Sequence, residues 1–406
     1  MSPSSWLTVI TSLAAVLGMI LWPRRSQEWI WPCGAGALLL LMQTLTPAQA
    51  WSAVLRGSDV YAFLAGIMIL AELARHEGLF DWLATHALRA AGGSQERLFA
   101  LVYVVGCGVT ALLSNDTTAV VLTPAIGAAL ARTRTDALPY LFACAFVANA
   151  ASFSLPISNP ANLVVFEREL PPLHLWLGAF ALPSLGAIVA TYLTLRALFR
   201  STLRAPLTVH AQPSPLPAAA AISATAIGIA AVALLVASAL HAEIGLTALA
   251  GSLMCLIAVS VRERGAAAFV IRHVAWQIVP LVAGLFVIVE ALDRAGVIGL
   301  LRAVLAHGKI LTAAVIAAAA NLFNNLPVAL AGGFALQSSP IHPTIAHTVL
   351  VAVDLGPNIS VTGSLATMLW LIALRRNGYD VSPWRFLQIG ILTTLPALAL
   401  AVLLVR

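Results

Sequence analysis

The sequence has 406 residues, of which 60% are hydrophobic and 9% charged, and its mean hydropathy is +0.94. Soluble domains carry about 25% charged residues, so the composition excludes an ordinary soluble protein and indicates one membrane domain in a lipid bilayer. The formal net charge of +6 comes from arginines scattered at the ends of apolar runs. That distribution is typical of membrane topology signals and excludes nucleic acid as a partner.

Apolar runs along the chain predict membrane spans. The first run has neither a basic start nor a small-residue cleavage site, so we expect a span there and not a signal peptide. The cysteines are dispersed without paired spacing, which argues against disulfides and a zinc site. Contact between substrate and Cys107 or Cys144 is left open. The predicted spans are 6–22, 33–50, 58–75, 138–166, 175–199, 218–240, 243–261, 276–293, 344–374 and 383–405.

Two further apolar stretches, 97–132 and 309–338, are interrupted midway by polar residues. The first contains the run Ser114 to Thr118, and the second contains Asn324-Asn325-Leu326-Pro327. Each arm has about 14–17 residues, too few to cross a bilayer at ~1.5 Å per residue. We therefore predict two re-entrant helical hairpins whose polar tips are enclosed by protein or face a water-filled cavity.

Two long runs contain helix breakers near their centres. Residues 138–166 include Pro156 and Pro160 within a polar stretch, and residues 344–374 include Gly356-Pro357 and Gly363. Proline and glycine in an apolar span free backbone groups that need other partners. We predict a broken transmembrane helix in each run.

An internal repeat relates the two halves of the chain. Residues 65–72 (AGIMILAE) match residues 283–290 (AGLFVIVE), and each is followed by an amphipathic stretch, a hairpin, a broken helix and a closing span. We predict an all-α polytopic membrane protein with two inverted-topology repeats, 1–200 and 218–406, joined by a linker at 201–217. With the N-terminus outside, sixteen Lys and Arg residues lie on the cytoplasmic side and six outside, which places the linker in the cytoplasm.

Ionisable acids and bases are almost absent from the hairpins and the broken helices. Histidine and cysteine aside, Asp116 is the only one in 98–131 and Asp354 the only one in 310–374, and 137–166 has none. An acid in the hydrocarbon region is costly, so both aspartates are candidate proton-coupling groups; the alternative is helix capping. We expect no metal and no cofactor. The candidate substrate-binding residues are neutral: Asn115, Thr117, Ser158, Asn159, Asn162, Asn324, Asn325, Gly363 and Ser364.

A neutral, hydrogen-bonding lining fits a small neutral polyol. Arsenous acid, As(OH)3, offers three hydroxyl groups to such a site, and boric or silicic acid would satisfy it equally. Glu72 and Glu290 occupy matching repeat positions with an arginine three or four residues later, so we interpret them as helix-end ion pairs. His76-Glu77 begins like a zinc-binding H-E-x-x-H, but the second histidine is missing, which argues against an intramembrane hydrolase.

Four motifs resemble the arsenite efflux permease (ArsB-type) family of the ion transporter superfamily. They are Ser114-Asn115-Asp116 with Val121-Leu122-Thr123-Pro124, Asn324-Asn325-Leu326-Pro327, Ser158-Asn159-Pro160-Ala161-Asn162, and Asp354-Leu355-Gly356-Pro357 with Gly363-Ser364-Leu365-Ala366-Thr367. Thr117 stands where that family has glycine, and Asn358 where lysine is common.

The resemblance implies a scaffold domain and a mobile transport domain in the inner membrane. It also implies efflux of arsenite and antimonite in exchange for protons, by elevator-type alternating access. Such proteins work alone or beside a soluble ATPase subunit (ArsA-type); the sequence leaves this choice and a homodimer open. A sodium/proton antiporter or an organic-anion symporter of the same superfamily is the alternative.

Overall fold

In the computed structural model, the chain is helical and shows no named strand among the residues that it describes. These residues are 3–21, 27–131, 133, 135–166, 170–207, 216, 218–240, 242–337 and 342–406. Within them, six helices are long and apolar enough to cross a membrane, or seven if one bent pair counts as a single span. The prediction of an all-α, multi-pass membrane protein is confirmed.

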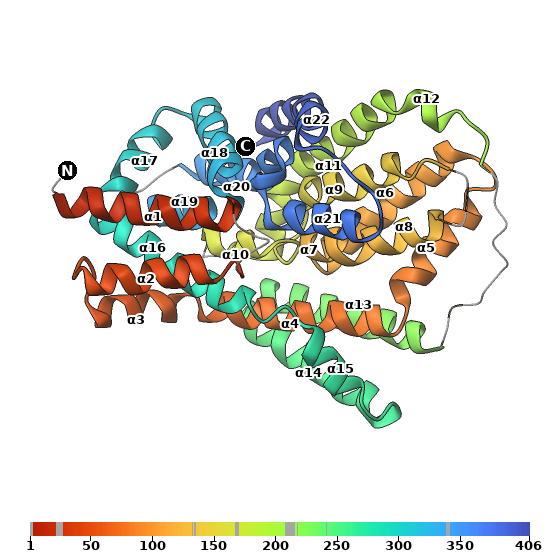
Figure 1. Ribbon diagram of the computed structural model, residues 1–406, viewed down its shortest axis with the longest axis horizontal. Helices are drawn as coiled ribbons and strands as arrows, with labels where there is room; N and C mark the ends of the chain where they lie inside the picture. The colour runs from red at the N-terminus through yellow and green to blue at the C-terminus, as the bar shows by residue number, and fades with distance from the viewer. Residues whose placement is uncertain are drawn as a thin grey trace.

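Figure 1 shows the arrangement of the helices. The first half contains α1 (Pro3–Leu21), α2 (Ile30–Leu41), α3 (Pro47–Arg56), α4 (Ser58–His76), α5 (Leu79–Ala90), α6 (Gln95–Leu112), α7 (Asn115–Thr117), the π-helical turn η1 (Thr118–Leu122), α8 (Thr123–Leu130), α9 (Leu138–Ala150), α10 (Pro160–Phe166), α11 (Leu173–Leu198) and α12 (Arg200–Leu203).

The second half contains α13 (Ala218–Ala239), α14 (Ile244–Arg262), α15 (Ala266–His273), α16 (Ile278–Arg294), α17 (Val297–Leu305), α18 (Lys309–Phe323), α19 (Asn325–Gln337), α20 (Pro343–Leu355), the 3-10 turns η3 (Gly356–Ile359) and η4 (Val361–Gly363), α21 (Leu365–Arg376) and α22 (Pro383–Leu404). Most of the predicted linker, residues 208–215 and 217, lies outside the described residues, as do positions 132 and 338 at the ends of the predicted hairpins.

The predicted span 33–50 is wrong, because two helices share it. α2 ends at Leu41, and α3 begins at Pro47. Thr46 accepts a hydrogen bond from the Gln49 backbone N–H, and the Gln49 side chain accepts one from the Thr46 backbone N–H. This capping box starts a new helix, and Pro47 cannot continue an earlier one. α3 then meets α4 at a bend of 46°.

Helices α4 and α14 run in the same direction and pack backbone to backbone. The Gly245 backbone N–H donates to the Asp59 carboxylate at 2.8 Å near their N-terminal ends. A Cβ on Gly66 would lie 2.5 Å from the backbone carbon of Ala248, so only glycine permits this approach. In Figure 1, α4, α13, α14 and α15 form the lower edge of the molecule, and α9, α11, α20 and α22 lie above them.

The four polar stretches are helix interruptions in the structure. α6 ends at Leu112 and α7 begins at Asn115, while α18 ends at Phe323 and α19 begins at Asn325. The chain between α9 and α10 is irregular, and 3-10 turns separate α20 from α21. The first arm is longer than predicted: α6 has 18 residues and is by itself long and apolar enough to cross a membrane.

Candidate functional site

The two interrupted helices meet at a buried carboxyl group. Asp354, near the end of α20, is fully buried, and its Oδ1 accepts a hydrogen bond from Nδ2 of Asn159 at 2.8 Å. Its other oxygen, Oδ2, has no hydrogen-bond partner. A buried carboxyl oxygen without a donor is energetically costly, and such a group is suited to binding a proton or a ligand.

A second hydrogen bond joins the same two regions. Nδ2 of Asn149, on α9, donates to Oδ1 of Asn358 at 2.9 Å, and Nδ2 of Asn358 donates to the carbonyl of Phe146 at 2.9 Å. Asn358 is one of the two positions at which the sequence departs from the pattern that the resemblance implies. Here its neutral amide bridges the two halves and introduces no positive charge beside Asp354.

The polar tip of the first pair of helices is held against the α9–α10 connection. The Asn115 backbone N–H donates to the Ser158 carbonyl, and the Ser158 hydroxyl donates to the Ala111 carbonyl, both at 3.1 Å. Ser114 caps α7 by accepting from the Thr117 backbone N–H. Thr117 has a helical φ of −60°, so the backbone here does not require glycine.

The second tip is built around two asparagines. Asn324 has a φ of +71° and a ψ of 151°, a strained conformation that is common only for glycine, and its Nδ2 donates to the Thr362 carbonyl at 3.4 Å. Asn321 donates to the Gly356 carbonyl at 2.8 Å and accepts from the Ser360 backbone N–H at 2.9 Å. The tip is thereby attached to the connection between α20 and α21.

Helices from each half of the chain also pack on helices of the other half. α10, from the first half, packs on α19 of the second, and α21, from the second half, packs on η1 and α8 of the first. A Cβ on Gly333 of α19 would lie 2.8 Å from the carbonyl oxygen of Val164 on α10. The close approach of these backbones encloses the polar tips within protein, as non-helical backbone in an apolar region requires.

A pocket of ≈ 180 Å³ lies where the first tip meets the starts of α10 and α21. Ser114, Asp116 and Thr117 line it from the tip, and Pro160 and Leu365 line it from the two broken helices. Its opposite wall comes from α4, the α1–α2 connection, the end of α15 and the start of α16. The polar lining residues on that wall are Glu28, Glu72, His273 and Gln277.

Carboxylates therefore face this pocket from both walls. Glu28, in the connection before α2, is half-buried, and burial together with the nearby charge of Asp116 raises the pKa of Glu28 above its usual range. Among the described residues that line the pocket there is no lysine or arginine. A larger pocket of ≈ 380 Å³, lined by Glu96, Arg196, Arg200 and Arg204, lies away from the interrupted helices.

The structure brings some of the predicted site residues together and separates others. Asn115 and Ser158 form one contact, and Asn159 and Asp354 form another. Asn162 points its amide to the carbonyls of residues 152, 155 and 156, so it holds the α9–α10 connection in shape. Among the described residues, no hydrogen bond links Asn324 or Asn325 directly to Asp354.

The remaining predicted residues lie at the second helix break. Gly363 is packed against Pro357 and Asn321, and the buried Ser364 hydroxyl has no hydrogen-bond partner. The sequence analysis did not single out Asn149, Asn321 or Glu28. An asparagine inside an apolar run was the available signal for the first two, whereas Glu28 stands between two runs, where a charge is ordinary.

The interpretation of Glu72 and Glu290 as members of helix-end ion pairs is confirmed. Nε of Arg75 lies 2.8 Å from a Glu72 oxygen, and Nε of Arg294 lies 2.7 Å from a Glu290 oxygen. Arg56 on α3 also pairs with Glu290. Glu72 additionally faces the pocket beside Asp116.

Comparison with known proteins gives consistent matches over almost the whole chain. Residues 8–374 match a protein family described as citrate transporter, CitMHS. The arsenical pump membrane protein of Escherichia coli K12 is 28% identical over 94% of each chain. That of Yersinia enterocolitica is 29% identical over 94% of this chain and 95% of its own, and an uncharacterized transporter of Mycobacterium tuberculosis is 29% identical over 84% of each.

One solved structure has a similar fold. The crystal structure of the YdaH transporter of Alcanivorax borkumensis aligns with a TM-score of 0.54, covering 100% of this chain and 98% of that one, at 13% sequence identity. At this identity the match concerns the fold alone. The resemblance to arsenite permeases inferred from the motifs is confirmed by the identity to arsenical pump membrane proteins.

Proposed function

The chain belongs to the citrate transporter family, CitMHS, and we propose that it exports arsenite and antimonite across the inner membrane in exchange for protons. Membership also confirms the expectation of a transporter, as opposed to an intramembrane hydrolase. The choice of a trihydroxy metalloid as substrate is supported by the arsenical pump proteins among its relatives and by the chemistry of the pocket.

The observation that carries this proposal is the lining of the pocket at the first tip. Asp116, Glu28 and Glu72 contribute carboxyl groups, Ser114 and Thr117 contribute hydroxyl groups, and the described lining includes no lysine or arginine. Such a surface repels polyanions and offers acceptors to hydroxyl donors. Arsenous acid and antimonous acid are neutral at pH 7 and carry three such donors, so they match the surface.

Proton coupling is assigned to Asp116 and Asp354. Asp116 faces the pocket, and Asp354 is buried behind it with one oxygen free of hydrogen bonds. An acid inside an apolar domain changes its charge, its hydration or its partner when a proton binds. In the proposed cycle, substrate and proton occupancy bias the movement of the tips and broken helices past the layer formed by α4 and α14.

We assign the halves, 1–200 and 218–406, to two inverted repeats. Gly66 packs against the α14 backbone, and the matching Gly284 would place a Cβ 2.8 Å from the Cys33 nitrogen on α2. The glycine at the matching position of each half thus packs against the second helix of the other half. In this assignment, 97–132 and 309–338 are re-entrant hairpins from opposite sides, the N-terminus is outside, and the linker 201–217 is cytoplasmic.

An organic-anion symporter is the second candidate, because the family that matches the chain is described as citrate transporter. A citrate site needs compensation for as many as three negative charges. The hairpins and broken helices contain no lysine or arginine between residues 98 and 131, 137 and 166, or 310 and 374. Helix N-termini could supply part of that compensation, but the carboxylates around the pocket oppose it.

Transport in everted vesicles tests the assignment. We expect vesicles containing the chain to take up As(III) when a pH gradient, acid inside, is imposed, without sodium and without added ATP. Asp354→Asn should abolish this uptake while leaving the amount of protein in the membrane unchanged. Asp380→Asn, at an exposed carboxylate paired with Arg375, is the matched control and should transport normally.

Two results would overturn the proposal. Uptake of citrate that As(III) does not inhibit would favour the organic-anion symporter, and strict sodium dependence would favour a sodium-coupled carrier. ATP-stimulated transport on addition of a soluble ArsA-type ATPase would add a partner. Cross-linking in the same vesicles would show whether the chain works as a homodimer.

A further inference from the structure

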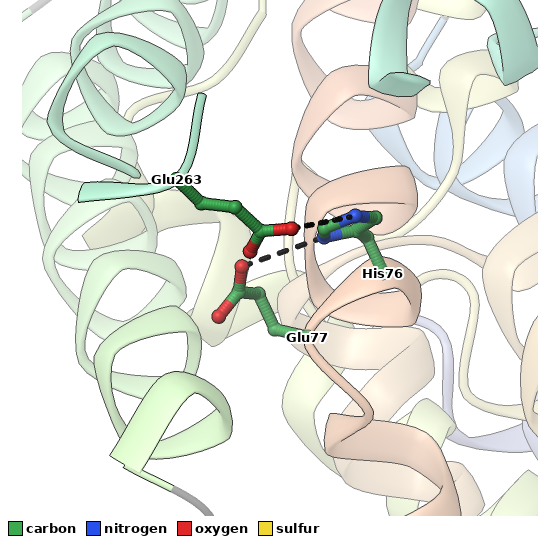
Figure 2. A group of neighbouring side chains, drawn as sticks. All are labelled: His76, Glu77 and Glu263. Atoms are coloured by element: carbon green, nitrogen blue, oxygen red, sulfur yellow. Dashed lines mark ion pairs between the residues drawn. The ribbon is translucent and has the colours of Figure 1, made fainter. Parts of the chain in front are cut away.

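Three side chains meet at the end of the α4–α14 layer. His76 is the last residue of α4, Glu77 follows it, and Glu263 follows the last residue of α14. Figure 2 shows the two carboxylates on the same side of the His76 ring, each joined to it by a dashed line. Nδ1 of His76 lies 3.4 Å from Oε1 of Glu77, and Nε2 lies 3.6 Å from Oε1 of Glu263.

Glu77 is the unusual member of this cluster. Its side chain is 1% exposed, and neither of its carboxylate oxygens has a hydrogen-bond partner. Nδ1 of His76 and Nη2 of Arg262 lie 3.4 Å and 3.7 Å from its oxygens, which is close enough for ion pairs but too far for good hydrogen bonds. A buried carboxylate is normally paired, hydrogen-bonded or bound to a metal, and in this structure the first two arrangements are incomplete.

We infer that His76, Glu77 and Glu263 form a binding site for a divalent cation of the zinc class. One ligand atom from each residue can be chosen so that all lie within 4.8 Å of one another. Zinc–nitrogen and zinc–oxygen bonds of about 2.0–2.2 Å place tetrahedral ligand atoms about 3.4 Å apart. Nδ1 of His76 already lies 3.4 Å from Oε1 of Glu77, which matches that value. Glu263 approaches the other ring nitrogen, Nε2, so its half-exposed side chain has to turn toward Nδ1 to complete the set.

The donor set selects the kind of cation. Imidazole nitrogen favours zinc and its neighbours in the first transition series, whereas magnesium and calcium prefer oxygen ligands alone. Three protein ligands leave a fourth position for water. The Phe269 ring, 4.6 Å from the His76 ring between centroids, fixes the imidazole, and the C-terminal ends of α4 and α14 add partial negative charge.

The sequence analysis predicted no metal, and this inference revises that prediction on the basis of a contact in the tertiary structure. His76-Glu77 lacks the second histidine of H-E-x-x-H, but the missing ligand is supplied by Glu263, from the other half of the chain. A cation here would clamp α4 to the α14–α15 turn. It would have a structural role, separate from the pocket at Asp116, and the inference does not depend on the transported solute.

Metal analysis of the purified full-length protein in detergent tests the site. We expect about one zinc per chain after equilibrium dialysis against ZnCl2, and we expect Glu263→Gln and His76→Ala to lose it. Glu243→Gln, an exposed glutamate at the other end of α14, is the matched control and should retain zinc. Because Glu263 is half-exposed, its variant should still fold.

Thermal unfolding provides a second readout. Zinc bound to the folded protein should raise the Tm of the wild type and of Glu243→Gln by about 3 °C or more, and it should leave Glu263→Gln unchanged. Equal zinc content in the wild type and in both site variants would overturn the inference. So would a Tm that zinc leaves unchanged in the wild type, which would identify the cluster as a direct ion bridge between His76 and the glutamates.

Discussion

Nδ2 of Asn159 donates to Oδ1 of Asp354 at 2.8 Å across a separation of 195 residues. Both residues are buried, and each lies at the interruption of its own helix, so the bond links the two halves at their least regular points. The free Oδ2 of Asp354 lies on the same carboxyl group. The Asp354 side chain therefore both links the two halves and carries the oxygen that we propose exchanges protons.

The Asn159–Asp354 bond should contribute measurably to stability. We expect Asn159→Ala to lower the free energy of unfolding by about 1–3 kcal/mol, because it leaves a buried carboxyl oxygen without its donor. In an Asp354→Asn background the same change should have a different effect, with a coupling energy of about 0.5 kcal/mol or more. Unfolding of the four proteins in detergent measures the cycle, and strictly additive effects would contradict the contact.

Glu28 should make the folded protein less stable at neutral pH than at acid pH. Its pKa is raised from the ordinary value of 4.5, so as pH rises the unfolded state loses this proton first and the folded state is penalised. We expect Glu28→Gln to raise Tm at pH 7 relative to the wild type. The difference should shrink as pH falls below 4.5, where both states keep the proton.

Thermal unfolding scans at pH 7 and at acid pH measure this effect. Asp81→Asn, at an exposed carboxylate, is the control and should show no such pH-dependent gain. A gain for Glu28→Gln that is the same at both pH values would show that packing, and not ionisation, is responsible.

Gly363 should not accept a side chain. An added Cβ would lie 2.5 Å from the Pro357 carbonyl oxygen and 2.8 Å from Oδ1 of Asn321, so Gly363→Ala would push apart the second helix break. We expect a loss of about 1–3 kcal/mol in stability and of most As(III) transport. Gly108→Ala, on an open face of α6 with nothing within 4 Å, should change neither, and normal transport by Gly363→Ala would refute this packing.

Asn324 should tolerate glycine better than alanine. Its φ of +71° and ψ of 151° cost an alanine about 1–3 kcal/mol, whereas glycine adopts this conformation freely. Both variants remove the hydrogen bond to Thr362, so the difference between them isolates the backbone conformation. Denaturant unfolding should rank Asn324→Gly above Asn324→Ala by about 1–3 kcal/mol, and the reverse order would contradict the positive-φ backbone at this tip.

The class of protein and the position of each helix interruption could be read from the sequence. Long apolar runs can satisfy their backbone groups in a membrane only as helices, and Pro156, Gly356 and Pro357 mark where regular helix must stop. The prediction of a single span at 33–50 was wrong, because Thr46-Pro47 starts a new helix inside an apolar run. A hydropathy average over the run does not detect such a local capping signal, so α2 and α3 were predicted as one span.

The sequence by itself determined which stretches are apolar, which are interrupted, and where the rare acids Asp116 and Asp354 stand. Only the tertiary structure decided which polar groups meet: Asn159 with Asp354, Asn149 with Asn358, and His76 with Glu263. Helix formation depends on neighbours within a few residues. A contact between residues more than a hundred positions apart depends on the packing of the whole chain, and no local pattern encodes it.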